Sequence, residues 1–245
     1  MTTDGIPPLP HAAEVVVIGG GVMGTSIAFH LAEAGVADVL LLERGALGGG
    51  STVKAAGGVR AQFSDPVNIA LGMRGLAAFE VFPNRPGQVI DLHQPGYLFL
   101  LTDPEQVRVY EKSVALQNSM GVPSRMLTPD EAKALSPAID TTGVLAAAFH
   151  ARDGYCSPES VVLGYATGAR RHGATVLSGI AVTGVRVDDG DVTSVITDRG
   201  EVRTRTVICA AGAWSKEVGA MVGIDLPIEP LRRQILITEP LSEEQ

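Results

Sequence analysis

Three glycines and one glutamate near the start of the chain have the types and the spacing that bind a dinucleotide. Gly19, Gly21 and Gly24 form the pattern G-x-G-x-x-G, and Glu43 follows about 20 residues later. The first glycine allows a tight turn, the second lets the backbone approach a pyrophosphate, and the third lets a helix pack closely on a strand. Unpaired N–H groups at a helix N-terminus attract phosphates, and a carboxylate accepts hydrogen bonds from a ribose diol. These residues therefore predict a nucleotide site.

The elements around these residues complete a βαβ unit. The apolar run 15–18 predicts a strand that enters the glycine turn. A helix is expected directly after it, with Met23, Ile27 and Leu31 on one face, and the apolar run 39–42 predicts a second strand that ends at the glutamate. Strand, turn, helix, strand and acid in this order are far more specific than the glycines alone.

Further along the chain, helical and extended patterns alternate before a group of short strands begins. Helices are expected at residues 66–82, 104–120, from 128, 157–172 and 214–222. Extended segments are expected at 88–101, 143–149 and 231–238. Short strands at 176–177, 180–187, 192–197 and 206–210, with turn signals at 188–190 and 198–200, predict a β-meander inserted after a helix.

The composition is that of a folded protein without a nucleic-acid surface. Hydrophobic residues make up 45% and charged residues 19% of the chain, and the formal net charge is −8. The two cysteines, Cys156 and Cys209, have no metal-ligand spacing, so we expect two buried, reduced thiols and no metal site. Residues 1–12 are expected to form a disordered tail. No apolar run has the length of a membrane span, and we expect a cytoplasmic protein.

With these pieces in place, the sequence resembles the FAD-dependent amine and amino-acid oxidoreductases of the sarcosine oxidase/D-amino-acid oxidase superfamily. The resemblance extends from about residue 13 to residue 240. Beyond the glycine pattern and Glu43-Arg44, it is carried by the segments 50–60, 153–158 (DGYCSP), 210–214 (AAGAW) and 226–234 (LPIEPLRRQ). Together these segments are specific for the superfamily but do not identify a substrate.

The resemblance implies an α/β fold with two domains. A Rossmann-like FAD-binding domain with a β-meander crossover would comprise residues 13–82 and 143–225. Part of an α+β substrate domain with an antiparallel sheet would comprise residues 83–142 and 226–245. Members of the superfamily continue well beyond this point, so we expect a chain that is truncated at its C-terminus.

The resemblance also assigns roles to individual residues. Gly19, Gly21 and Gly24 would face the pyrophosphate of FAD, and Glu43 the adenosine ribose. The other cofactor-binding residues would be Arg44, then Ser51 and Thr52 near the phosphates and ribityl chain, Val182 at the adenine, and Ala211 and Gly212 in a tight turn beside the cofactor.

Arg60 corresponds to an arginine beside the flavin. In some relatives this arginine pairs with the substrate carboxylate, a task that suits a planar fork of N–H donors, and an ordinary ion pair or a flavin contact is the alternative. Tyr97, Tyr155 and Trp214 are expected in the core or at interfaces. Relatives with covalent flavin often carry a histidine in the loop between Glu43 and Phe63, where this chain has none, so non-covalent FAD is expected.

The leading hypothesis is a flavoenzyme that oxidises the C–N bond of a small amine or amino acid by hydride transfer to FAD. Sarcosine, dimethylglycine, glycine, proline and D-amino acids are the candidate substrates, and oxygen or an electron acceptor would reoxidise the flavin. The alternative is an FAD-binding module or subunit that is inactive without its missing C-terminal part or a partner. A weaker alternative, an NAD-dependent Rossmann enzyme, is disfavoured by the meander and the segment 51–60.

Overall fold

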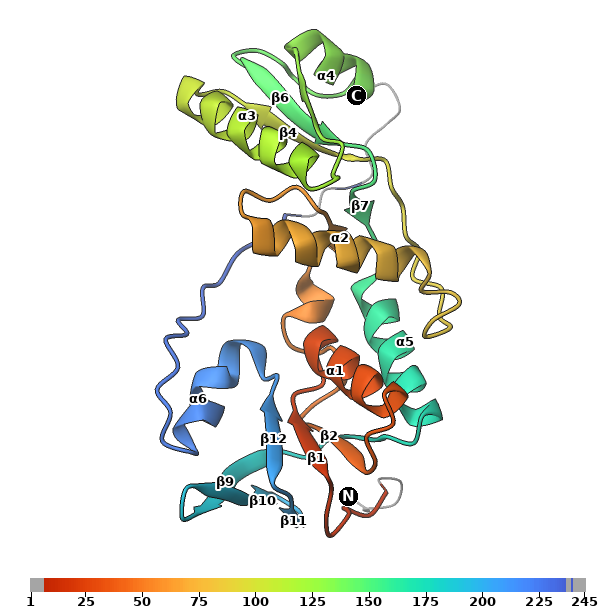
Figure 1. Cartoon of the computed structure of the whole chain (residues 1–245), viewed down its shortest axis with the longest axis vertical. Helices are drawn as coiled ribbons and strands as arrows, with labels where there is room; N and C mark the ends of the chain where they lie inside the picture. Colours follow the sequence, from red (N-terminus) through yellow and green to blue (C-terminus); the bar gives the residue numbers. More distant parts are fainter. Residues whose placement is uncertain (1–6, 237–238, 240–245) are drawn as a thin grey trace. The chain divides into compact units, whose positions relative to one another are not determined.

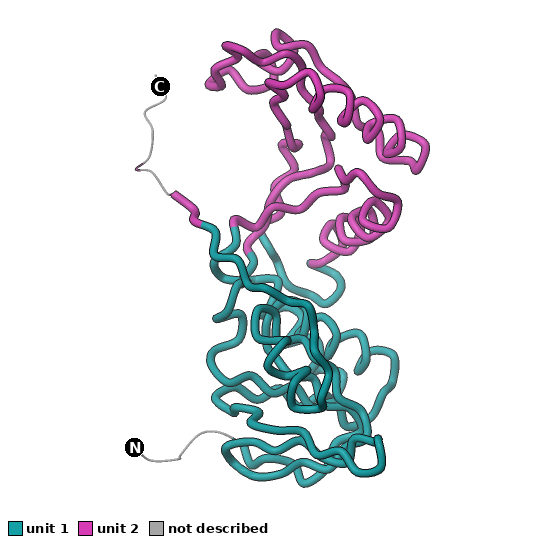
Figure 2. Tube along the Cα trace, turned by 90° about the vertical axis from the view of Figure 1, so that its left-hand side faces the viewer, with its two compact units in different colours: residues 1–55, 83–90, 158–233 teal, residues 56–82, 91–157, 234–245 magenta. Residues whose placement is uncertain are grey.

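The computed structural model describes residues 7–236 and residue 239. The chain divides into two compact units (Figure 2). Unit 1 comprises residues 1–55, 83–90 and 158–233, and unit 2 comprises residues 56–82, 91–157 and 234–245. No helix in the described part of the chain combines the length and the apolar character needed to cross a membrane.

Unit 1 is built on a parallel sheet with the strand order β12-β1-β2-β8 (Figure 1). Its strands are β1 (Val15–Ile18), β2 (Val39–Glu43), β8 (Thr175–Ser178) and β12 (Thr206–Cys209). β1 is buried along its whole length, as a central parallel strand should be, and it pairs with β2 on one side and β12 on the other. The carboxyl ends of these three strands therefore lie side by side, which confirms the Rossmann-like part of the expected fold.

Helices α1 (Val22–Glu33) and α5 (Pro158–Arg171) pack against each other in unit 1. The expected apolar face of α1 was wrong: Met23 is 65% exposed, and Ile27 and Leu31 are only partly buried. The buried face is the one with small residues and a single aromatic ring: Gly24, Thr25, Ala28, Phe29 and Ala32. Small side chains allow the close approach to the neighbouring strand and helix, which the spacing of the larger apolar residues did not reveal.

The expected β-meander is present as three antiparallel strands, β9 (Val182–Asp188), β10 (Asp191–Thr197) and β11 (Gly200–Arg203). The turn between the first two has positive φ at Asp189 (52°) and Gly190 (88°), as a two-residue hairpin requires. β11 was not expected as a strand. The chain then returns to the parallel sheet as β12 and continues into a 3₁₀ turn η2 (Gly212–Trp214) and helix α6 (Ser215–Ala220).

Unit 2 contains an antiparallel sheet with the order β4-β6-β5, which confirms the α+β part of the expected fold. Its strands are β4 (Tyr97–Leu101), β5 (Arg125–Leu127) and β6 (Ala146–His150), and a separate pair joins β3 (Gly58–Val59) to β7 (Gly154–Tyr155). Its helices are α2 (Pro66–Glu80), α3 (Pro104–Ser119) and α4 (Pro129–Leu135). Each begins with a proline after a capping side chain: Asp65, Asp103 or Thr128.

Two expectations for the ends of the chain differ from the structure. Residues 231–236 have no regular structure where a strand was expected, and residues 237–238 lie outside the described residues. A strand needs a hydrogen-bonded neighbour, and an apolar run cannot show whether one is within reach. In the expected tail, residues 1–6 lie outside the described residues. Within the described part of this segment, the His11 carbonyl accepts a hydrogen bond of 3.0 Å from the Arg203 N–H, so the backbone there is attached to the fold and does not form a loose tail.

The compact units divide the chain at other points than the expected domains. Residues 56–82 and 143–157, which we expected in the FAD-binding domain, belong to unit 2. Compactness does not test which residues bind a cofactor, so the division into an FAD-binding and a substrate domain stays a prediction. The cysteines Cys156 and Cys209 are free, and burial raises the pKa of the Cys156 thiol. The expected burial of Cys209 was wrong: it is exposed at the end of β12, which is an edge strand of the parallel sheet.

The contact between α1 and α5 predicts which helical glycine cannot be replaced. A Cβ on Gly168 would lie 2.7 Å from Pro86 Cβ and 2.8 Å from Phe29 Cδ2, whereas a Cβ on Gly75 would meet nothing within 4 Å. We expect Gly168→Ala to destabilise the protein by about 1–3 kcal/mol. Gly75→Ala, the matched control in α2, should be neutral or stabilise by up to about 1 kcal/mol. Urea unfolding followed by circular dichroism measures both, and equal shifts of the midpoint would contradict the packing described.

Candidate functional site

A cavity of about 420 Å³ opens in unit 1 where β1, β2 and β12 end. Three stretches of chain, one after each of these strands, form most of its wall. In parallel α/β sheets this edge is the usual place for a ligand, because the loops that leave neighbouring strands converge there. The lining residues for which no cofactor role was expected include Val22, Leu42, Gly45, Ala46, Gly49, Gly50, Ile180, Ala210, Trp214 and Glu217.

The Glu43 carboxylate holds the glycine turn and the loop after β2 together. Its Oε2 accepts a hydrogen bond of 2.6 Å from the Gly20 N–H, and its Oε1 accepts one of 2.8 Å from the Gly45 N–H. A third bond, 2.8 Å from the Gly48 N–H to the Gly20 carbonyl, joins the same two loops. A carboxylate oxygen has more than one acceptor site, so Glu43 can still receive a ribose hydroxyl while it fixes the turn.

The three glycines of the turn differ in what surrounds them. Gly19 has φ of 111°, and a Cβ there would lie 2.5 Å from the Ala210 carbonyl oxygen. A Cβ on Gly24 would lie 1.8 Å from the Gly19 carbonyl oxygen, so this position allows the close packing of helix on turn. A Cβ on Gly21 would meet only Thr52 Oγ1, at 3.3 Å. Gly21 therefore faces open space, as the glycine that admits a pyrophosphate should.

The N-terminus of α1 opens into the cavity, and few protein groups there accept its N–H groups or balance its positive dipole end. Gly21 is the N-cap and offers no side chain, and the first turn contains no acidic residue. Thr52 supplies one acceptor, since its Oγ1 takes a hydrogen bond of 3.2 Å from the Val22 N–H. Ser51 lines the cavity beside it. The positive end of the helix dipole and its remaining N–H groups fit an anionic group, which is the chemistry of a diphosphate.

Arg44 and Trp214 reach each other from the two strands that flank β1. The Arg44 guanidinium carbon lies 4.2 Å from the centre of the Trp214 ring, and both side chains line the cavity. No ion pair joins Arg44 to a carboxylate among the described residues. Trp214, which we expected in the core or at an interface, is 37% exposed and forms part of the cavity wall.

The last three expected cofactor residues lie around the same cavity. Val182 is the first residue of β9, and Ala211 precedes the turn η2. Gly212 has φ of 55°, and a Cβ there would meet nothing within 4 Å. The structure thus brings nine of the ten expected cofactor residues together around one cavity, whereas Gly24 does not line it and is buried where the helix packs on the turn. Their role in binding stays a prediction, but the arrangement of donors, the carboxylate and the open glycine fits the nucleotide half of FAD.

Arg60 belongs to unit 2 and lines a separate cavity of about 290 Å³ there. Its guanidinium lies over three aromatic rings, 5.0 Å from the centre of Phe63, 5.8 Å from Tyr97 and 5.3 Å from Phe99. In the described part of the chain no carboxylate forms an ion pair with it. The ion-pair alternative for Arg60 therefore finds no partner in the structure, and its contact with a substrate or a flavin stays a prediction.

Because the Glu43 carboxylate accepts two hydrogen bonds that fix the turn, we expect its replacement to lower the affinity for a nucleotide by more than the loss of its charge would. We expect Glu43→Gln to weaken ADP binding by about tenfold or more, because an amide cannot accept from both N–H groups. Glu217→Gln, the control, removes a negative charge from the same cavity and should leave the affinity unchanged or increase it. Calorimetric titration with ADP measures both. A gain of affinity in both variants would contradict the role given to Glu43.

Trp214 is the only tryptophan of the chain, so its fluorescence reports on this cavity alone. We expect ADP to change the emission, and Arg44→Gln to change the emission of the free protein and weaken ADP binding about three- to tenfold. Lys216→Gln is the control, because Lys216 pairs with Asp225 instead of lining the cavity. ADP binding that leaves the emission unchanged would show that the nucleotide does not occupy this cavity.

Comparisons with known proteins agree with this geometry. The family model described as FAD dependent oxidoreductase matches residues 14–245. Mitochondrial dimethylglycine dehydrogenase from Rattus norvegicus is 34% identical over 97% of this chain and 28% of its own length, and mitochondrial sarcosine dehydrogenase from Mus musculus is 32% identical over 96% and 26%. The crystal structure of L-proline dehydrogenase from P. horikoshii matches with a TM-score of 0.85 and 35% identity, over 90% of this chain and 58% of that one. The chain spans about a quarter of the length of these curated relatives, and it belongs to the family of FAD-dependent oxidoreductases.

Proposed function

We propose that this chain binds FAD non-covalently and serves the oxidation of the C–N bond of a small amine or amino acid. The observation that carries the proposal is the cavity at the ends of β1, β2 and β12, where Glu43, the open Gly21 and the N-terminus of α1 converge. Membership of the FAD-dependent oxidoreductases supports the choice of FAD over NAD.

In this proposal the residues of unit 1 bind the adenosine diphosphate half of the cofactor. The diphosphate lies at Gly21 and the first turn of α1, where the unpaired N–H groups and the dipole favour an anion. Glu43 accepts hydrogen bonds from the ribose hydroxyls. Arg44, which has no carboxylate partner among the described residues, supplies the positive charge at the rim.

Arg60 is the residue proposed to receive the substrate. A guanidinium held against aromatic rings and without an ion-pair partner in the described residues suits a carboxylate, which it can bind through two parallel N–H bonds. The names of the relatives include dimethylglycine, sarcosine and proline, each an amine with a carboxylate. Bound flavin supplies the acceptor for the hydride, and oxygen or another electron acceptor, or a partner subunit, completes the cycle.

Non-covalent attachment is proposed from the composition of the loop after β2. No histidine lies between Glu43 and Phe63, and the loop offers Lys54, Ser51 and Thr52 as its reactive side chains. Both hydroxyl residues line the cavity, and Thr52 is already engaged with the Val22 N–H. A cytoplasmic location stays a prediction from the sequence.

Reconstitution with FAD tests the proposal. We expect the purified chain to take up one FAD, with the flavin absorption bands shifted relative to the free cofactor because the ring system leaves water. After acid precipitation the flavin should remain in the supernatant, as non-covalent binding requires. A yellow precipitate would show a covalent link. A chain that binds ADP but gives no amine-dependent bleaching of the flavin would be an FAD-binding module, and a chain that binds neither ADP nor FAD would overturn the proposal.

A further inference from the structure

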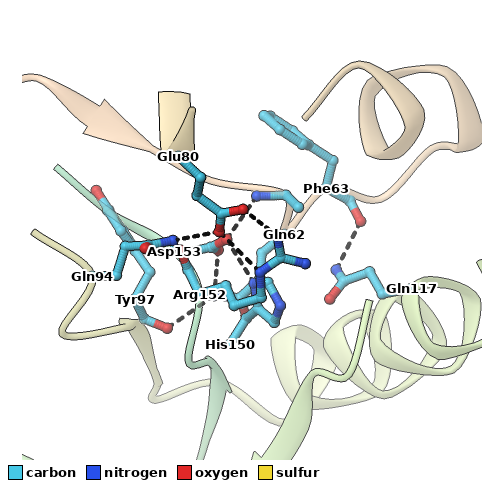
Figure 3. Close-up of polar contacts among 10 residues, drawn as sticks. Gln62, Phe63, Glu80, Gln94, Tyr97, Gln117, His150, Arg152 and Asp153 are labelled. Atoms are coloured by element: carbon cyan, nitrogen blue, oxygen red, sulfur yellow. Dashed lines mark hydrogen bonds and ion pairs between the residues drawn. The ribbon is translucent and has the colours of Figure 1, made fainter. Parts of the chain in front are cut away.

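A buried carboxylate in unit 2, that of Asp153, joins two stretches that lie far apart in the sequence, residues 61–62 and 150–153 (Figure 3). Asp153 is 0% exposed, and its side chain accepts three hydrogen bonds. Oδ1 accepts 2.8 Å from the Ala61 N–H and 2.6 Å from His150 Nδ1, and Oδ2 accepts 3.2 Å from Gln62 Nε2. Burying a carboxylate away from water costs free energy unless hydrogen bonds replace those to water. These three bonds therefore allow Asp153 to be buried.

Asp153 and the residue after it fix the backbone on both sides of Arg60. On one side Val59 pairs with Gly154, the residue after Asp153, in the β3–β7 bridge. On the other side Ala61 donates its N–H to the Asp153 carboxylate. A third restraint comes from α2, because a Cβ on Gly72 would lie 2.7 Å from the Arg60 carbonyl oxygen, so the helix packs directly on this peptide.

Buried side-chain hydrogen bonds, one of them within the Asp153 network, also hold two of the residues whose aromatic rings surround the Arg60 guanidinium. Gln62 Nε2 donates to the Tyr97 carbonyl at 2.9 Å as well as to Asp153. The buried Gln117 side chain donates to the Phe63 carbonyl at 2.8 Å. Two of the three rings under Arg60 therefore belong to residues whose backbone is held by buried side-chain hydrogen bonds.

We propose that Asp153 is a positioning residue for Arg60: its buried carboxylate fixes the backbone segment and, through Gln62, the aromatic surface against which the guanidinium lies. This proposal rests on the anion-binding role proposed for Arg60. A guanidinium on an exposed, flexible segment pays conformational entropy each time it binds a carboxylate, whereas a fixed one does not. His150, whose Nε2 is buried without a partner among the described residues, serves as the third donor to Asp153.

The test follows the reactivity of Arg60 with phenylglyoxal, measured by peptide mass mapping, and requires neither flavin nor substrate. In the native chain the aromatic rings shield Arg60, so it should react more slowly than Arg74, an exposed arginine on α2. We expect Asp153→Asn to raise the rate at Arg60 by about threefold while Arg74 is unchanged, because the guanidinium leaves the rings. Unchanged reactivity of Arg60 in a folded Asp153→Asn chain would overturn the proposal.

Two further variants keep the test decisive. Gln62→Leu removes the donor that joins Asp153 to Tyr97 and should also accelerate Arg60 selectively. If Asp153→Asn does not fold, Gln62→Leu takes its place as the test. Unchanged reactivity of Arg60 in Gln62→Leu would count against the proposal. Glu80→Gln is the control, because it breaks the neighbouring exposed ion pair with Arg152 without touching the network, and Arg60 should react as in the native chain. Failure of FAD to bind would leave these rates unaffected, so the two proposals fail separately.

Discussion

Backbone N–H groups outside helices and strands must find acceptors, and in this chain carboxylates provide them at the two places of functional interest. Glu43 accepts from Gly20 and Gly45 in unit 1, and Asp153 accepts from Ala61 in unit 2. Each carboxylate ties an irregular loop to a neighbouring strand end. Without such acceptors the N–H groups of the buried residues Gly20 and Ala61 would each cost free energy comparable to a lost hydrogen bond, and the loops would not keep one conformation.

In unit 1 this constraint explains why a ligand cavity forms at one edge of the sheet. Buried parallel strands end together, and the glycines after β1 leave room that larger residues would fill. The carboxylate at the end of β2 then fixes the turn so that Gly21 stays open and the N-terminus of α1 stays uncovered. The cavity is thus preformed, and the entropy of ordering the loops is spent during folding and not during binding.

Sequence patterns predicted what depends on local residues. The strand–turn–helix–strand unit, the meander turns and the helix expected from residue 128 follow from neighbouring positions and are present. Contacts between distant segments were not predictable: Arg44 meets Trp214 only because β2 and β12 flank β1. The strand expected at 231–238 is absent from the described residues 231–236 for the same reason, since pairing depends on a partner elsewhere in the chain. The buried face of α1 was missed because close packing selected Gly24 and Ala28 over larger apolar residues.

Whether a nucleotide diphosphate binds where β1 meets α1 can be decided by a crystal structure of the chain with ADP. We expect the phosphates to accept hydrogen bonds from the N–H groups of the first turn of α1 that Thr52 leaves unbound, and the ribose hydroxyls to donate to Glu43. ADP bound elsewhere, or bound here with its ribose away from Glu43, would show that this assignment of the cavity is wrong.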